Sequence, residues 1–156
     1  MELQPPIRWH ADRAAWRLIG LRYLPLFAGF SLAWEVAQLP LYTLWREAPV
    51  SWIAFSVVHC TVGDVLIGVS ALALALILTQ AAEPARWRWA RIAILTTILG
   101  VTYTVFSEWM NAGLLGNWEY SDWMPVLTLG GVSIGLSPLL QWILLAPLAL
   151  RFARTC

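Results

Sequence analysis

The chain has 156 residues, of which 60% are hydrophobic and 12% are charged, with a formal net charge of +1 and a mean hydropathy of +0.67. Soluble domains carry about a quarter charged residues, so this composition excludes an ordinary soluble protein and favours a polytopic membrane protein. All ten basic residues are arginines spread along the chain, which excludes a basic surface for nucleic acid. The length allows a single domain over residues 1–156.

The first apolar window follows an arginine-rich N-terminal segment. Trp9 and Trp16 lie seven residues apart with arginines between them, so residues 7–18 are predicted either as an interfacial amphipathic helix or as a solvated leader. The apolar run that follows continues through Glu35 without a small-residue cleavage pattern. It is therefore predicted to be a retained span over about residues 21–42, and not a signal peptide.

Three more apolar windows follow, over about residues 52–78, 91–110 and 124–150. Windows of about 20 residues match the thickness of a bilayer core, and at that length only helices satisfy their own backbone in lipid. The predicted fold is therefore all-α, a four-helix transmembrane bundle. Gly131 and Gly135 in the fourth window are interpreted as a small-xxx-small pair for close helix packing.

The distribution of arginines predicts the orientation. The N-terminal segment carries four arginines, the loop near residues 80–91 carries three and the C-terminal tail carries two, whereas the other two loops hold only Arg46. Under the positive-inside rule, both termini are then cytoplasmic. The prediction is a multi-pass protein of a bacterial-type inner membrane, with the lipid bilayer as its first partner.

Four ionisable residues, Glu35, His59, Asp64 and Glu108, interrupt the apolar windows. Lipid penalises such groups unless they face a partner, a cavity or water. The helical rise places three of them in the outer half of the membrane and Asp64 near the midplane. Polar residues recur at three- and four-residue steps in every window, so four polar stripes are expected to converge on a pocket that opens outward. The stripes are Ser31, Glu35, Gln38 and Tyr42; Ser56, His59 and Gly63 beside Cys60 and Asp64; Thr104, Glu108 and Asn111; and Ser133, Ser137 and Gln141.

The pocket predicts a set of catalytic residues: Glu35, His59, Glu108 and Asp64. In this hypothesis two glutamates act as acid and base and the histidine carries the proton. A structural alternative stays open for each residue. Glu35 could be a neutral acid bonded to Gln38, and His59 could be a buried histidine whose hydrogen bonds are satisfied. Asp64 could be a structural partner of the fourth span, and Glu108 could be a solvated glutamate near the membrane boundary. The residues expected to bind a substrate are Gln38, Asn111, Trp34, Tyr103 and Gln141.

Two further features leave alternatives open. The loop over residues 117–125 is rich in aromatic and acidic residues, and it is interpreted either as a cover for the pocket or as an interfacial anchor. No HExxH, His-pair or CxxC motif is present, so metal and cofactor remain unknown, although carboxylate and imidazole groups suit several metals.

The segment Glu35-Val-Ala-Gln38-Leu-Pro40, followed by His59 in the next window, resembles four-span sterol-isomerase-like proteins. In those proteins a glutamate precedes a Gln-Leu-Pro sequence and a histidine follows. The spacing differs by one residue, and the third and fourth windows do not continue the likeness. The resemblance covers a handful of residues and assigns no activity or residue role here.

Three functional hypotheses follow from the residues. The first is an acid–base enzyme for a lipophilic small molecule that enters laterally or from the outer leaflet, for which isomerisation or cyclisation of an isoprenoid-like substrate would fit. The second is a proton- or ion-coupled carrier. The third is a non-catalytic subunit or assembly factor, in a homo-oligomer or a larger membrane complex. The enzyme is slightly favoured.

Overall fold

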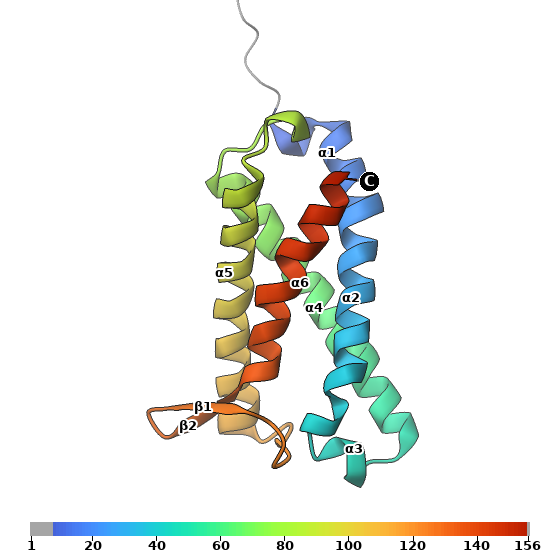
Figure 1. The fold of residues 1–156 in the computed structure, drawn as a ribbon, viewed down its shortest axis with the longest axis vertical. Coiled ribbons are helices and arrows are strands. Elements are labelled where there is room, and N and C mark those ends of the chain that lie inside the picture. Colours follow the sequence, from blue (N-terminus) through green and yellow to red (C-terminus); the bar gives the residue numbers. More distant parts are fainter. Residues whose placement is uncertain (1–7, 156) are drawn as a thin grey trace, which may run out of the picture.

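The computed structural model describes residues 8–155, which form a bundle of four long helices with a small hairpin at one end (Figure 1). Short elements precede or interrupt the long helices at several points. In chain order the elements are η1 (Trp9–Ala11), α1 (Arg13–Leu18), η2 (Ile19–Tyr23), α2 (Leu24–Gln38), η3 (Leu39–Leu41), α3 (Leu44–Glu47), α4 (Val50–Leu78), η4 (Pro84–Arg86), α5 (Trp89–Glu108), η5 (Trp109–Leu115), β1 (Val126–Leu129), β2 (Val132–Gly135) and α6 (Leu136–Thr155).

Four helices are long and apolar enough to cross a membrane: Arg13–Leu41, Val50–Leu78, Trp89–Leu115 and Leu136–Thr155. Large apolar side chains such as Leu66 on α4 and Ile94 on α5 are exposed on the outer surface of the bundle. A soluble protein would bury such surfaces, so the structure supports a multi-pass membrane protein. The predicted second and third spans are confirmed as helices, with the third extended to Leu115 by the π turn η5.

The prediction of a helical span over 124–150 is wrong in its first half, so the fold is not purely α-helical. Strands β1 and β2 pair antiparallel across a two-residue turn, Gly130-Gly131, whose φ angles are +59° and +83°. Glycine adopts such angles without steric cost, and this geometry matches the twist of a hairpin. The glycines therefore make a turn and not the predicted helix contact. Helix α6 begins at Leu136, whose N–H donates to the Pro125 carbonyl at 2.8 Å.

The prediction of a separate interfacial helix over 7–18 is also wrong where it can be examined. Residues Arg13–Leu18 continue through η2 into the first span, and the Asp12 side chain accepts a hydrogen bond from the Ala14 N–H at their start. Between Arg8 and Asp12, the part of the N-terminal segment that the structure describes, the chain makes one 3-10 turn, with Trp9 buried and its N–H bonded to the Ala81 carbonyl. Ile7 lies outside the described residues.

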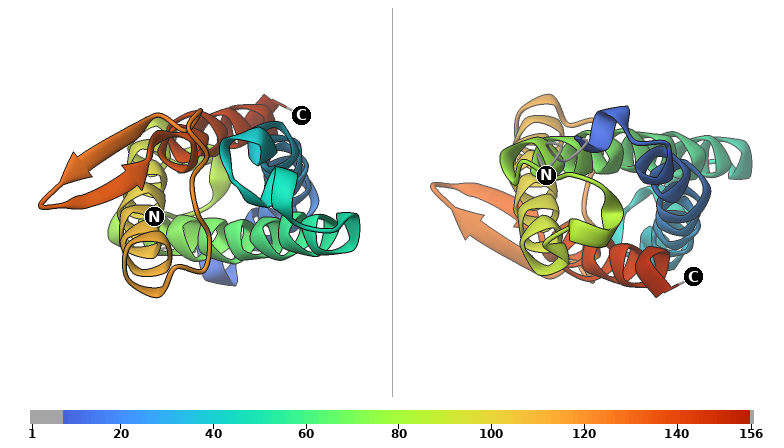
Figure 2. Two further views of the ribbon diagram at one scale, coloured as in Figure 1. Left: turned by 90° about the horizontal axis from the view of Figure 1, so that it is seen from below. Right: turned by 90° about the horizontal axis from the view of Figure 1, so that it is seen from above.

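The four helices form a ring in which α2 and α5 are diagonally opposite, each packed against α4 and α6 (Figure 2). Helix α4 is steeply tilted: its C-terminal end lies beside α5, whereas its N-terminal end lies beside α3 on the far side (Figures 1 and 2). The described chain ends and the loop before α5 share one end of the bundle, and α3 and the hairpin share the other (Figure 1).

The core fills the half of the bundle nearest the chain ends. Tyr23 stacks on Phe27, and the Phe27 ring contacts Trp142 with a centroid distance of 5.3 Å. Two glycines allow these rings to approach the neighbouring backbones, because a Cβ at Gly68 would lie 2.6 Å from Phe27 and a Cβ at Gly100 would overlap the Trp142 indole. Close packing therefore fills the centre of this half of the bundle.

Candidate functional site

A cavity of about 550 Å³ lies between the helices in the half of the bundle nearer to α3 and the hairpin. It is large enough for much of a drug-sized molecule. Eight of the nine residues predicted for the site line this cavity: Glu35, Gln38, His59, Asp64, Tyr103, Glu108, Asn111 and Gln141. Polar residues from all four long helices therefore line one cavity, whereas Ser133, which was predicted on a helical stripe with Gln141, lies on strand β2.

The ninth predicted residue, Trp34, does not line the cavity. Its Nε1 donates to Ser137 Oγ at 3.2 Å, and Ser137 donates to Gln38 Oε1 at 2.8 Å. Gln38 Nε2 then donates to Glu35 Oε1 at 2.9 Å. These three hydrogen bonds form a series that runs from Trp34 to Glu35. Because Ser137 donates to the Gln38 oxygen, the Gln38 amide is held in one orientation and presents its N–H to Glu35. Trp34 thus supports the wall from behind.

Asp64 lies beside Glu35 on the neighbouring helix. Gln141 on α6 donates its Nε2 to Asp64 Oδ2 at 2.5 Å, and the Asp64 and Glu35 carboxyl groups are close enough to interact directly. The two carboxyl groups are flanked by two amides, Gln38 and Gln141, that donate to them. An adjacent carboxyl pair can pass a proton between its members and a bound molecule, which is a common arrangement in acid–base sites.

Glu108 stands on α5, diagonally opposite α2. It is buried, and the Tyr120 hydroxyl donates to its Oε2. The same hydroxyl accepts a hydrogen bond from the Gly135 N–H at 3.0 Å, so Tyr120 is fixed from both sides. Burial and the bond to Glu108 raise the pKa of Tyr120 above its usual value, which keeps this hydroxyl protonated as a donor.

The loop between η5 and β1 contributes to the wall of the cavity at the end of the bundle that carries α3. It is joined to the end of the first span, because Thr43 N–H donates to the Glu119 carbonyl at 3.1 Å and Ser121 N–H donates to the Leu41 carbonyl at 2.9 Å. Asn117 and Trp118 from this loop line the cavity. The loop therefore covers the site, which was one of its two predicted interpretations.

His59 occupies a different position from the carboxyl groups. It is exposed at the edge of the cavity and stacks on Phe55 with a centroid distance of 5.6 Å. Within residues 8–155 it makes no hydrogen bond to a carboxyl group, so the structure does not bring it into contact with them. Tyr103 is also exposed at this edge, whereas Asn111 donates to the Ser107 carbonyl at 2.9 Å.

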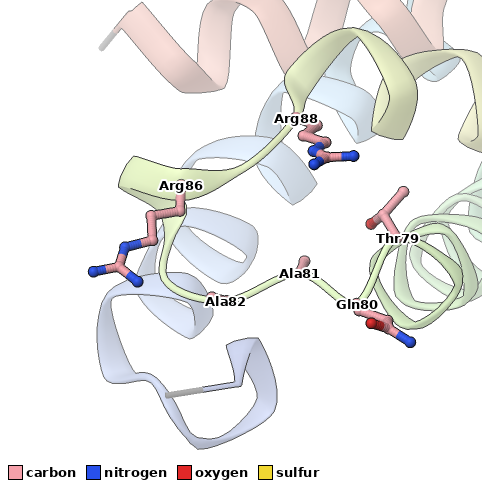
Figure 3. Close-up of a pocket in the computed structure, with 6 residues that line it drawn as sticks. All are labelled: Thr79, Gln80, Ala81, Ala82, Arg86 and Arg88. Atoms are coloured by element: carbon pink, nitrogen blue, oxygen red, sulfur yellow. The ribbon is translucent and has the colours of Figure 1, made fainter. Parts of the chain in front are cut away.

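In the described part of the chain, no group of three or more His, Cys, Asp or Glu side chains is arranged to hold a metal ion. A second pocket of about 280 Å³ lies at the opposite end of the bundle, between α4 and η4 (Figure 3). It is lined by backbone and by two arginines, and Arg86 points away from Arg88 and pairs with Glu83 at 2.6 Å. No carboxyl group lines it, so the larger cavity is the candidate site.

Sequence reasoning missed Tyr120, Trp118 and Trp142 as parts of this site. The Trp-Glu-Tyr run at residues 118–120 gave the only signal for the loop, since polar and aromatic residues gathered in one loop favour a binding role. Trp142 is one residue beyond the predicted Gln141 and forms part of the cavity wall next to the core. Comparison of the chain with protein families, curated proteins and solved structures finds no match.

Proposed function

We propose that this chain is a multi-pass enzyme of a bacterial-type inner membrane that moves protons to and from a lipophilic substrate held in the cavity. The observation that carries the proposal is the placement of the carboxyl groups. Glu35 and Asp64 form a pair on one side of the cavity, and Glu108 lines it from the diagonally opposite helix. A bound molecule between them would have a proton donor on one side and an acceptor on the other.

The arginines support an orientation with both termini in the cytoplasm. All the arginines except Arg46 lie in the N-terminal segment, in the loop before α5 and the first turn of α5, or near the end of α6, and these parts share one end of the bundle (Figure 1). Under the positive-inside rule that end faces the cytoplasm. The cavity then lies at the depth of the outer leaflet, within reach of molecules dissolved in lipid.

The simplest reaction for this arrangement is the movement of a double bond. One carboxylic acid donates a proton to one carbon of the double bond, which leaves the positive charge on the other, and a carboxylate removes a proton from the next carbon beyond that cationic centre. One C–H bond forms and one breaks, so the substrate is isomerised without a change in atoms or oxidation state. Aromatic side chains along the wall, among them Tyr103 and Trp142, would stabilise the cationic intermediate.

The packed half of the bundle argues against the carrier alternative. A carrier needs a polar route to the other side, but Tyr23, Phe27, Leu72 and Leu76 are fully buried beneath the cavity. The subunit alternative predicts that changing Glu35 or Glu108 to its amide impairs assembly only. The experiment below separates that alternative from the enzyme.

The test uses solvent deuterium, because it does not require the substrate to be known in advance. The protein in lipid nanodiscs is incubated in D2O with a bacterial lipid extract, and the lipids are analysed by mass spectrometry. We expect one lipid species to gain deuterium with the wild-type protein, and this gain to fall by about 10²–10⁴-fold in Glu35→Gln and Glu108→Gln.

Glu47→Gln is the matched control, because Glu47 is an exposed glutamate on α3 outside the cavity. It should exchange like the wild type. Exchange that persists in both cavity variants, or no exchange with folded wild-type protein, would show that the carboxyl groups do not perform acid–base catalysis on a lipid.

A further inference from the structure

We infer that the substrate enters the cavity sideways from the bilayer, between the outer halves of α4 and α5, and that its polar head is a hydrogen-bond donor such as an amine or a hydroxyl. This inference rests on the proposed function and adds to it a route and a chemical class.

The opening follows from the tilt of α4. Its N-terminal half leans away from α5 towards α3, so the backbones of the two helices diverge towards that end of the bundle (Figures 1 and 2). The lining residues on this side are exposed: Phe55 by 55% and Tyr103 by 48%. On the opposite side the lining residues are buried, with Gln38 exposed by 6% and Gln141 by 3%.

The two ends of the cavity are obstructed. The loop that carries Trp118 is bonded to the end of the first span at Leu41 and Thr43, which covers the outer end. Towards the chain ends, Phe27 and Trp142 fill the space between the helices. Entry between α4 and α5 is therefore the route that needs the least rearrangement.

The edge of this opening is aromatic. Trp52 stacks on Phe55 with a centroid distance of 5.3 Å, and Phe55 stacks on His59 at 5.6 Å. These three side chains follow one face of α4, and all three line the cavity while remaining exposed. A hydrocarbon chain can lie along such a row, and the amphipathic His59 ring marks the change from the lipid side to the polar interior.

The interior favours a head that donates hydrogen bonds. Three carboxyl groups line the cavity, and no arginine or lysine does so. The buried polar atom there that lacks a partner among residues 8–155 is Trp118 Nε1, a donor that a hydroxyl or neutral amine could accept from. Carboxylate oxygens are acceptors, so a head that also donates hydrogen bonds would satisfy them, and an anionic head would be repelled.

The route is tested by carboxyl labelling in nanodiscs, which does not depend on turnover. We expect the lipid-soluble dicyclohexylcarbodiimide to label cavity carboxyl groups at least tenfold more than a charged, water-soluble carbodiimide. Ser107→Trp, which adds bulk at the α5 edge of the opening, should lower this labelling. Val58→Trp is the matched control, since Val58 is exposed on α4 and does not line the cavity. Stronger labelling by the charged reagent, or no effect of Ser107→Trp, would overturn lateral entry.

The head group is tested with three probes of equal chain length: hexadecylamine, hexadecanol and hexadecanoate. We expect the amine and the alcohol to raise the thermal unfolding midpoint of the protein in nanodiscs, and hexadecanoate to leave it unchanged. Asp64→Asn should raise at least tenfold the hexadecylamine concentration that is needed for the same shift of the unfolding midpoint. Equal effects of all three probes would overturn the chemical class. Selective binding without solvent exchange would disprove the proposed enzyme and leave this inference intact.

Discussion

Tyr120 and Glu108 are joined by a hydrogen bond that connects the covering loop to the wall of the cavity. The Tyr120 hydroxyl donates to Glu108 and also accepts from the N–H of Gly135, the last residue of β2. One phenol therefore links α5, the loop and the hairpin that leads into α6. The carboxyl group of Glu108 is positioned by an element that lies outside the helices.

Tyr120→Phe should destabilise the protein and release the loop. The substitution leaves a buried carboxyl oxygen without its donor, which costs about 1–3 kcal/mol. The measurement is the free energy of unfolding in detergent, with hydrogen exchange of residues 117–124 as the local readout. Tyr42→Phe is the control, because the Tyr42 hydroxyl makes no hydrogen bond with any other described residue. Equal losses in the two variants would show that the bond to Glu108 contributes nothing.

Stability should also fall at alkaline pH through Tyr120. Its folded pKa is raised above the unfolded value of about 10, so above that pH the unfolded chain binds fewer protons than the folded one. The free energy of unfolding then decreases as the pH rises, by up to about 1.4 kcal/mol per pH unit. Thermal midpoints measured from pH 9 to 11 should fall less steeply in Tyr120→Phe than in the wild type. Parallel curves would contradict this prediction.

Gly100→Ala should be strongly destabilising, although alanine is the better helix former. A Cβ at this position overlaps the Trp142 indole, which is fully buried, so the indole or the helix would have to shift. Overpacking of this kind costs about 1–3 kcal/mol. Gly29→Ala is the matched control in α2, since no atom lies within 4 Å of its added Cβ. That variant should be neutral or stabilised by up to about 1 kcal/mol.

The hairpin turn gives a separate prediction. Gly130→Val and Gly131→Val should each unfold the hairpin locally, because both residues have positive φ angles that cost a branched side chain about 1–2 kcal/mol or more. Limited proteolysis of residues 126–135 is the measurement. Val126→Ala, at an exposed strand position, should leave the protease resistance unchanged. Resistance in all three variants would contradict the turn.

Asp64 and Gln141 should be energetically coupled. Gln141→Leu removes the amide that donates to Asp64, and Asp64→Leu leaves that amide without its acceptor. The double variant removes both partners, so its loss should be smaller than the sum of the single losses by about 0.5–3 kcal/mol. A double-mutant cycle on the free energy of unfolding measures this difference. Strict additivity would show that the two side chains do not interact.

The sequence predicted the wall of the site well because charged groups inside apolar helices are costly and must face inward. Glu35 and Glu108 could be located in this way, and the helical period then placed Gln38 and Asn111 on the same sides. Tyr120 could not be located by the same argument. It lies in a loop, where no period fixes the direction of a side chain, and its partner Gly135 is 15 residues away.

The hairpin was missed for a different reason. Residues 126–135 are apolar enough to pass as part of a membrane span, and hydropathy alone does not distinguish a strand pair from a helix. The Gly130-Gly131 pair between two short apolar runs that contain β-branched residues was the available signal, since this pattern is typical of a two-residue hairpin turn. The exposed position of His59 was equally unpredictable, because it depends on the tilt of α4, which the sequence does not specify.

The length of α4 gives bilayer thickness a role in this protein. Its 29 residues make a rod of roughly 44 Å, whereas a hydrocarbon core is about 30 Å thick and α6 has only 20 residues. A rod that is too long fits by leaning, and the lean of α4 is what separates it from α5. Shorter-chain lipids should increase the lean and widen the gap, and longer-chain lipids should narrow it. The lipid that surrounds the protein would then set how readily its interior is reached.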